Sequence, residues 1–103
     1  MFELIFHPEA EAEILALKGA MKGKVLHGLS KLEAEGHQLR YPDTKPVRDG
    51  LFELRAGGKD ISRTFFAFNK GRKIYILRTF IKKTAKTPSS EIELALSRLE
   101  QLL

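Results

Sequence analysis

Three runs between Leu51 and Phe80 have the apolar and polar pattern of β-strands. The second and third runs are rich in Phe, Ile, Thr and Tyr, which fit the pleated surface of a sheet. Glycine-containing segments, Ala56–Lys59 and Asn69–Arg72, separate the runs. Short strand-like runs joined by such turns predict an antiparallel meander over Leu51–Phe80.

The turns determine which residues face one another across this meander. If Asn69–Arg72 is a symmetric tight turn, Arg63 lies opposite Arg78, and the same logic places Glu53 opposite Arg63. A row of charged residues then crosses one face of the sheet. Alternatively, a three-residue loop with a bulge at Gly71 shifts the pairing by one residue and sends Arg78 to the other face.

Two helices are expected before the meander. Pro8 starts the first helix, which runs to about Lys18 and has acidic residues in its early turns. The second helix ends at Gly36, a residue suited to a C-terminal cap. The two form a helix hairpin over Pro8–Gly36. Its apolar stripe consists of Ala10, Ile14, Leu17, Met21, Val25, Leu29 and Leu32.

A third helix is expected over Ser89–Leu103, after the start signal Thr87-Pro88. The central strands are apolar at both odd and even positions, as in Phe65–Phe68, so both faces of the sheet should be covered. The hairpin covers one face and the C-terminal helix covers the other. The apolar stripe of the third helix consists of Ile92, Ala95, Leu96, Leu99 and Leu102.

The remaining segments complete the prediction. Phe2–Phe6 is a short apolar run that suits a first strand, whereas His37–Gly50 has no periodicity and is expected to be a loop. The predicted fold is α+β, a single domain over residues 1–103. Its element order is β-α-α-β-β-β-α, with an antiparallel sheet, a helix hairpin on one face and a C-terminal helix.

Composition adds a positive charge to this picture. Among 103 residues, 18 are Lys or Arg and 13 are Asp or Glu, which gives a net charge of +5 and favours an anionic partner. The chain has no cysteine, which excludes disulfides, thiolate zinc sites and thiol catalysis. No run is long enough for a signal peptide or a membrane span, so we expect a cytoplasmic protein without membrane association.

No metal site or cofactor is expected. His7, His27 and His37 fall in different predicted elements, and none has a carboxylate at metal-ligand spacing. The sequence also lacks a phosphate-binding P-loop, a dinucleotide-binding glycine motif and a nucleophile elbow.

Cations gather instead around the predicted sheet. The set consists of Lys45, Arg48, Arg55, Arg63, Arg78, Lys82 and Lys83. One interpretation is that these charges protect sheet edges from aggregation, with Glu53 and Arg63 in a cross-strand salt bridge. In the other, arginines bind a phosphodiester and an ammonium group acts as a base. Arg63 is then a surface cation, and Arg63→Ala abolishes activity at little cost to the fold.

Three segments together resemble a known toxin family: LFELR, SRTFFAF and IYILRTFIKKTAKTPSSEIELALSR. They are similar to the Gp49-like, HigB-type branch of the RelE/ParE toxin superfamily, whose members are toxins of type II toxin–antitoxin modules. The resemblance extends over almost the whole chain. It implies a microbial RNase fold and ribosome-dependent mRNA cleavage by a metal-independent endoribonuclease, an mRNA interferase that inhibits translation.

The resemblance also implies roles for individual residues. Catalytic roles fall on Arg55, Arg63, Lys82 and Lys83, and RNA-binding roles fall on Lys45, Arg48, Arg78 and Lys86. The base-stacking tyrosine that RelE carries near the start of its last helix is absent, because this region reads Thr87-Pro88-Ser89-Ser90. The late His or Asp of other members is also absent, which leaves the general acid and base open.

Two alternatives stay open beside the endoribonuclease. One is a toxin of the ParE type that inhibits DNA gyrase without cleaving RNA, and the other is a non-toxic RNA-binding relative. The basic run that ends in Lys82-Lys83 favours the endoribonuclease over the ParE type. The implied partners are mRNA, the ribosome and a helix-turn-helix, HigA-like antitoxin in a toxin–antitoxin hetero-oligomer.

The positive charge gives a prediction for capture by this antitoxin. We expect antitoxin carboxylates near Arg55, Lys82 or Lys83, so association should slow as salt rises, because exposed charges are then screened. The measurement is the association rate at low and high salt for the wild type and for Lys82→Ala/Lys83→Ala. An association rate that responds to neither change would place the antitoxin on another face.

Overall fold

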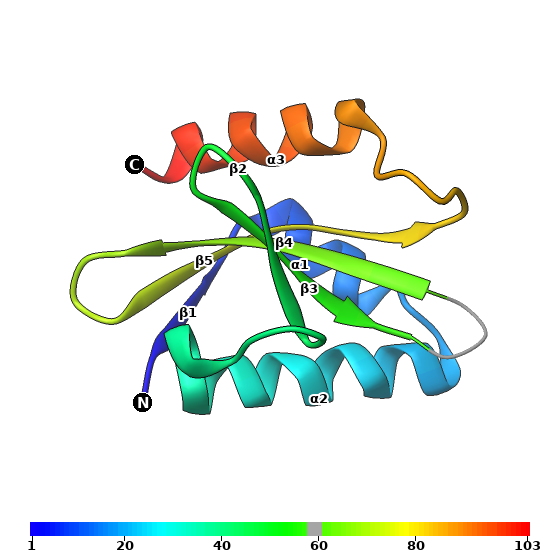
Figure 1. The fold of residues 1–103 in the computed structure, drawn as a ribbon, viewed down its shortest axis with the longest axis horizontal. Helices are drawn as coiled ribbons and strands as arrows, with labels where there is room; N and C mark the ends of the chain where they lie inside the picture. Colours follow the sequence, from blue (N-terminus) through cyan, green and yellow to red (C-terminus); the bar gives the residue numbers. More distant parts are fainter. Residues whose placement is uncertain (58–60) are drawn as a thin grey trace.

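A five-stranded sheet runs through the computed structural model, which describes residues 1–57 and 61–103 (Figure 1). The strands lie in the order β1-β5-β4-β3-β2. The elements are β1 (Glu3–Phe6), α1 (Pro8–Leu15), α2 (Gly19–Glu35), the 3-10 helix η1 (Gly36–Gln38), β2 (Thr44–Arg48), β3 (Leu51–Ala56), β4 (Ile61–Asn69), β5 (Lys73–Lys82) and α3 (Ser89–Leu102). The predicted α+β class and element order are confirmed, with one strand added.

The added strand is β2, which forms inside the segment that was expected to be a loop. It pairs antiparallel with β3 at the edge of the sheet. Pro46 lies within it, and an edge strand tolerates proline because one side of its backbone needs no ladder bond. The sequence pattern missed this strand because it is short, Pro46 interrupts it and Pro42 lies just before it.

The first strand also departs from the predicted antiparallel sheet. β1 pairs parallel to β5, from Glu3 opposite Lys73 to Phe6 opposite Ile76. The connections between β3, β4 and β5 are too short for a crossover, so these strands pair antiparallel. The long connection after β1 imposes no such direction, so the sheet is mixed.

The predicted row of Glu53, Arg63 and Arg78 is wrong. Arg63 lies opposite Arg55 and Phe80, whereas Glu53 and Arg78 both lie opposite Phe65. The loop between β4 and β5 is three residues long, and Gly71 within it has a positive φ. This is the alternative turn considered above, which shifts the pairing by one residue. A second irregularity in β5 then shifts the pairing again. Arg78 therefore returns to the face of Arg63, one step along the strand.

Helices cover both faces of the sheet, as the two-sided apolar pattern predicted (Figure 1). On one face, α1 and α2 pack against Leu54, Phe66 and Ile76. On the other face, α3 packs against Phe65 and Leu77. Every residue of the two predicted apolar stripes belongs to one of these two clusters.

Gly36 ends α2, as predicted. Its φ of 53° lies in the left-handed region, and a Cβ placed on it would lie 2.1 Å from the ring of Phe2. The chain therefore needs glycine here for conformation and for space. The first helix ends earlier than expected, at Leu15 rather than Lys18. The predicted turn Ala56–Lys59 lies partly outside the described residues.

A carboxylate binds the backbone of β5 beyond the point where its pairing with β1 ends. Glu13 on α1 accepts a hydrogen bond from the backbone N–H of Thr79 at 3.1 Å. It also accepts two from Arg98 of α3, at 3.0 and 2.8 Å, and one from Arg78 at 2.6 Å. Arg98 is only 5% exposed and also donates to the carbonyl of Leu77. One side chain thus joins α1, β5 and α3.

Burial raises the pKa of Glu13, but hydrogen bonds from Arg98, Thr79 and Arg78 outweigh it, so its pKa is lowered. A lowered pKa means that the folded state favours the ionised carboxylate. Its contribution to stability is complete above the usual carboxyl range and is lost as the pH falls through the lowered value.

No helix in the described part of the chain is both long enough and apolar enough to span a bilayer.

We predict that Glu13→Gln destabilises the fold by about 1–3 kcal/mol at pH 7, because buried donors lose their charged acceptor. Urea unfolding at pH 7 and pH 3 measures this difference. The gap between wild type and variant should narrow at pH 3, because the Glu13 carboxyl of the unfolded wild-type chain takes up a proton below its usual range, whereas the folded state favours the ionised form. The control is Glu11→Gln, an exposed residue of the same helix. An equal cost for both variants, or a gap that widens in acid, would contradict the role of Glu13.

Candidate functional site

Besides Arg48 and Arg78, which lie opposite Leu51 and Phe65, four predicted site residues share the face of the sheet on which α3 packs. Strand pairing places Lys45 opposite Glu53, Arg55 opposite Arg63, and Lys82 opposite Ile61. Paired residues point to the same side, and so do alternate residues along a strand. Together these pairings define a cationic face that consists of Lys45, Arg55, Arg63 and Lys82.

A buried carboxylate lies within the cationic face. Glu53 Oε2 is 3.3 Å from Nε of Arg63 and 3.7 Å from Nε of Arg55. Nη1 of Arg63 donates a hydrogen bond to the carbonyl of Ser62 at 3.0 Å. The predicted salt bridge between Glu53 and Arg63 is confirmed, although the two residues are diagonal neighbours.

Arg63 is not the surface cation that the sequence suggested. It is only 4% exposed. Burial lowers the pKa of Arg63, attraction from Glu53 opposes that shift, and repulsion from Arg55 adds to it. An arginine keeps its charge even so, and a buried charge needs its counterion. The expectation that Arg63 is a surface cation is therefore wrong, and we now expect Arg63→Ala to destabilise the fold.

Arg55 presents its guanidinium beside an exposed aromatic ring. Its Cζ lies 5.5 Å from the ring centroid of Tyr41, which is 71% exposed. Tyr41, Arg55 and Arg63 line a hollow of about 370 Å³ at the end of β3. The hollow thus combines a cation for a phosphate with a flat ring for a base.

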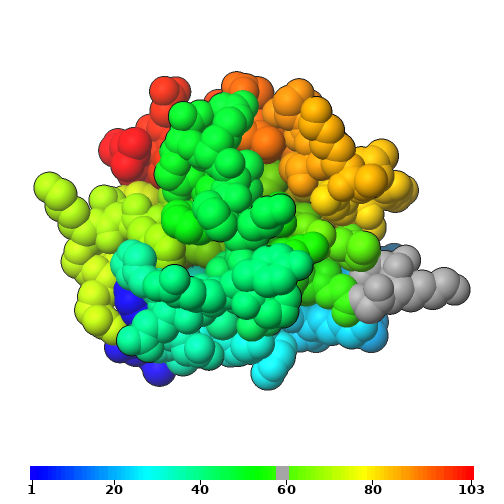
Figure 2. Space-filling model, in the orientation of Figure 1, coloured from blue at the N-terminus to red at the C-terminus, as the bar shows by residue number. Residues whose placement is uncertain are grey.

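Sequence reasoning missed Tyr41. It lies in the segment before β2, and the only local signal is a lone aromatic residue next to Pro42. Figure 2 shows that η1, the following loop and β2 lie on the molecular surface between α2 and α3. The fold thus brings to Arg55 an aromatic ring from a part of the chain far from the last helix.

The predicted lysines lie on or near the same face. Lys82 is partly exposed at the end of β5, and Lys83 and Lys86 are exposed in the loop before α3. No ion pair found among residues 1–57 and 61–103 involves these lysines or Lys45. Their ammonium groups are therefore available to an anionic partner.

Two predicted RNA-binding residues are engaged by carboxylates. Arg78 binds Glu13 and Glu91 at 2.6 and 2.7 Å, and Arg48 pairs with Asp49 and Glu93. Acidic side chains of α1 and α3 therefore form ion pairs with the sheet. Arg48 and Arg78 anchor α3 in this structure.

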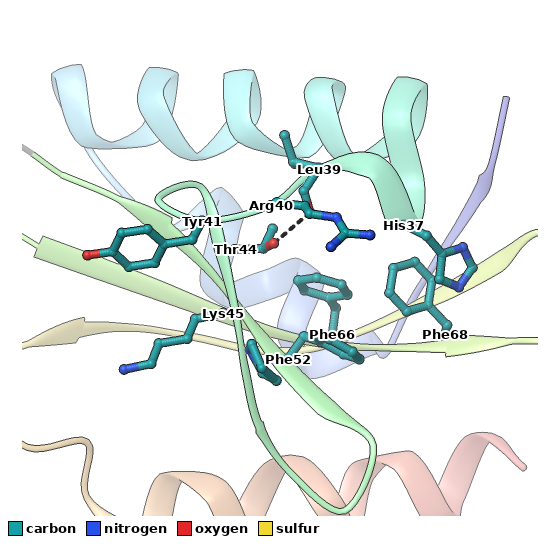
Figure 3. Close-up of a pocket in the computed structure, with 10 residues that line it drawn as sticks. His37, Leu39, Arg40, Tyr41, Thr44, Lys45, Phe52, Phe66 and Phe68 are labelled. Atoms are coloured by element: carbon teal, nitrogen blue, oxygen red, sulfur yellow. Dashed lines mark hydrogen bonds between the residues drawn. The ribbon is translucent and has the colours of Figure 1, made fainter.

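A larger hollow of about 480 Å³ lies on the other side of Tyr41 (Figure 3). Its walls include Phe52, Phe66 and Phe68 from the sheet and His37 from η1. The His37 ring stacks on Phe68, with 3.8 Å between ring centroids. We call this hollow the aromatic pocket. None of its lining residues belongs to the predicted catalytic set.

The described residues offer no cluster of three His, Cys, Asp or Glu side chains that would hold a metal ion. The cationic face itself contains lysine, arginine and the buried Glu53. Its own groups can bind an anion, stabilise developing negative charge and carry protons on lysine.

Comparison with known families gives one match. Residues 12–100 match the model of the phage-derived Gp49-like protein family (DUF891). The match spans most of the chain, so the protein belongs to this family, which is part of the RelE/ParE-like toxin superfamily. A search of the curated proteins found no match.

The buried pair gives a prediction for Arg63. Arg63→Ala should cost about 3–5 kcal/mol of stability, because it leaves the Glu53 charge buried with only the more distant Arg55 as a partner. The double variant Glu53→Gln/Arg63→Met should be more stable than Arg63→Ala, since it removes both charges. Urea unfolding measures both variants, with exposed Lys83→Ala as the control. Equal stability of Arg63→Ala and wild type would show that the pair does not support the fold.

Proposed function

We propose that this protein is the toxin of a type II toxin–antitoxin pair and cleaves mRNA on the ribosome as a metal-independent endoribonuclease. Membership of the Gp49-like family supports the toxin class. The observation that carries the proposal is the hollow in which Arg55 lies beside exposed Tyr41, with Lys82 on the same face. Its chemistry suits a single-stranded RNA backbone and one unstacked base.

The cationic face accounts for binding. Arg55 offers a fork of donors to a phosphate, and the Tyr41 ring offers a stacking surface to a neighbouring base. Lys45, Lys83 and Lys86 attract the RNA backbone without reading its sequence. Arg63 is buried opposite Arg55 on the neighbouring strand and acts as a positioning residue through Glu53.

The proposed reaction is an internal transfer at phosphorus. The ribose 2′-oxygen forms a bond to phosphorus while the bond from phosphorus to the 5′-oxygen breaks. The 2′-hydroxyl loses its proton to a base and the 5′-oxygen gains one from an acid, which leaves a 2′,3′-cyclic phosphate and a 5′-hydroxyl. Lys82 and Lys83 are the proposed proton carriers, and Arg55 stabilises the charge on the phosphorane.

The proposed partner is a helix-turn-helix, HigA-like antitoxin. A surface that binds phosphate is silenced when acidic groups cover it, and the exposed lysines around Arg55 provide the complementary charge. The expected assembly is a toxin–antitoxin hetero-oligomer.

We predict that Tyr41→Ala lowers translation-dependent mRNA cleavage about 5- to 150-fold, the range expected for the loss of one stacked base. Tyr41→Phe keeps the ring and should keep most of the activity. Arg55→Ala should lower cleavage at least as far, since it removes the contact to the phosphate. Primer extension on mRNA from a translating extract measures cleavage, and Lys70→Ala in the exposed turn before β5 is the control.

Three results would contradict this proposal. Growth arrest with intact mRNA and DNA damage would favour a ParE-like inhibitor of DNA gyrase. Expression without any growth arrest, combined with RNA binding, would identify a non-toxic relative. Full cleavage by soluble Tyr41→Ala and Arg55→Ala would move the site away from this hollow.

A further inference from the structure

The aromatic pocket lies beyond Tyr41, on the α2 side of the sheet (Figure 3). Phe52 and Phe66 form one stacked pair, with 5.6 Å between centroids, and Phe68 meets both rings edge to face. Its volume of about 480 Å³ falls in the range of about 300–1,000 Å³ found for small-molecule sites. The pocket therefore has room for a flat ring system between aromatic walls.

Two cations lie at the pocket. Arg40 and Lys45 are both exposed, and neither forms an ion pair with any residue that the structure describes. The lining includes no Asp or Glu. Aromatic walls next to free cations suit a ligand that joins a flat ring to an anionic group.

The pocket is continuous with the proposed RNA site. Tyr41 lines both hollows, and Lys45 belongs to the cationic face and lines the aromatic pocket as well. A strand of RNA bound at Arg55 reaches the pocket by passing Tyr41 at the edge of the sheet. This continuity favours a nucleotide over an unrelated ligand.

The edge strand argues against the main competing occupant. A partner peptide that adds a strand needs a row of free backbone N–H and C=O groups. β2 has Pro46 in the middle, without an N–H, and the N–H of Thr44 already donates to the carbonyl of Arg40 at 3.3 Å. The two residues therefore offer an incoming strand no free donor.

We propose that the aromatic pocket is a nucleobase subsite for single-stranded RNA, in which Arg40 binds the phosphate of the nucleotide and Lys45 turns from the position drawn in Figure 3 to bind it as well. This inference rests on the proposed function, because it extends the RNA path from the cationic face. Bases of any identity stack on aromatic rings, and the polar edge of the base faces the open mouth. The subsite holds the chain in register and does not read its sequence.

The test is an NMR titration of isotope-labelled protein with AMP, CMP, GMP and UMP. Ribose 5-phosphate, which carries the anion without the base, is the matched ligand control. All four nucleotides should shift the ring signals of His37, Phe52 and Phe68, and ribose 5-phosphate should not. Arg40→Ala/Lys45→Ala should weaken nucleotide binding about tenfold, as expected for the loss of charged phosphate contacts. Lys24→Ala/Lys70→Ala removes equal charge from exposed positions elsewhere and should leave binding unchanged.

Several outcomes would overturn the subsite. Equal shifts from ribose 5-phosphate would show anion binding alone, and the absence of any shift would show no site. Ring shifts caused only by an acidic peptide with a central Phe would assign the pocket to a protein partner. The mRNA cleavage assay separates this inference from the proposed function. If mRNA cleavage depends on Arg55 but nucleotides cause no shifts in the pocket, only the subsite is contradicted. If nucleotides cause these shifts but mRNA stays intact, only the proposed cleavage is contradicted.

Discussion

The carboxylate of Glu13 on α1 binds β5 and α3 at the same time. It accepts a hydrogen bond from the backbone N–H of Thr79, at a point of β5 beyond the end of β1. It also accepts hydrogen bonds from both terminal nitrogens of Arg98 on α3. Glu13 and Arg98 are 85 residues apart in sequence. A charged acceptor with several charged donors is stronger than neutral hydrogen bonds, and its loss leaves buried donors unpaired. The placement of α3 over the sheet depends on this contact.

The fold divides the cations into two groups. Arg63, Arg78 and Arg98 are paired with carboxylates at or below the surface. Arg55 is only partly paired, and the lysines around it have no counterion among the described residues. In the ranges that the structure describes, the cations Lys45, Arg55 and Lys82 thus form no ion pair with the carboxylates of α3. The carboxylates of α3 pair with Arg48 and Arg78, so the cations at the end of the sheet are left to bind an anion.

The segment from η1 to β2 provides part of the lining of both hollows. It adds an edge strand, places Tyr41 beside Arg55, and encloses the aromatic pocket against Phe52 and Phe68. Thr44 fixes the base of this segment through a hydrogen bond from its hydroxyl to the carbonyl of Leu39, at 2.7 Å (Figure 3). Both hollows therefore depend on a stretch of chain that has no regular apolar pattern.

The sequence by itself determined the helices, the central strands and their two covered faces, because each depends on local periodicity. The cap at Gly36 and the stripe from Ala10 to Leu32 follow from the same local rules. The sequence also contained a weak sign that Arg98 is buried. This charged residue falls on the apolar stripe of α3, between Ala95 and Leu102. Only the tertiary structure decided the strand register, because it depends on a loop and a bulge that each shift the pairing by one residue. It also decided that Arg63 is buried and that Tyr41 meets Arg55, because burial and contact are set by partners distant in the chain.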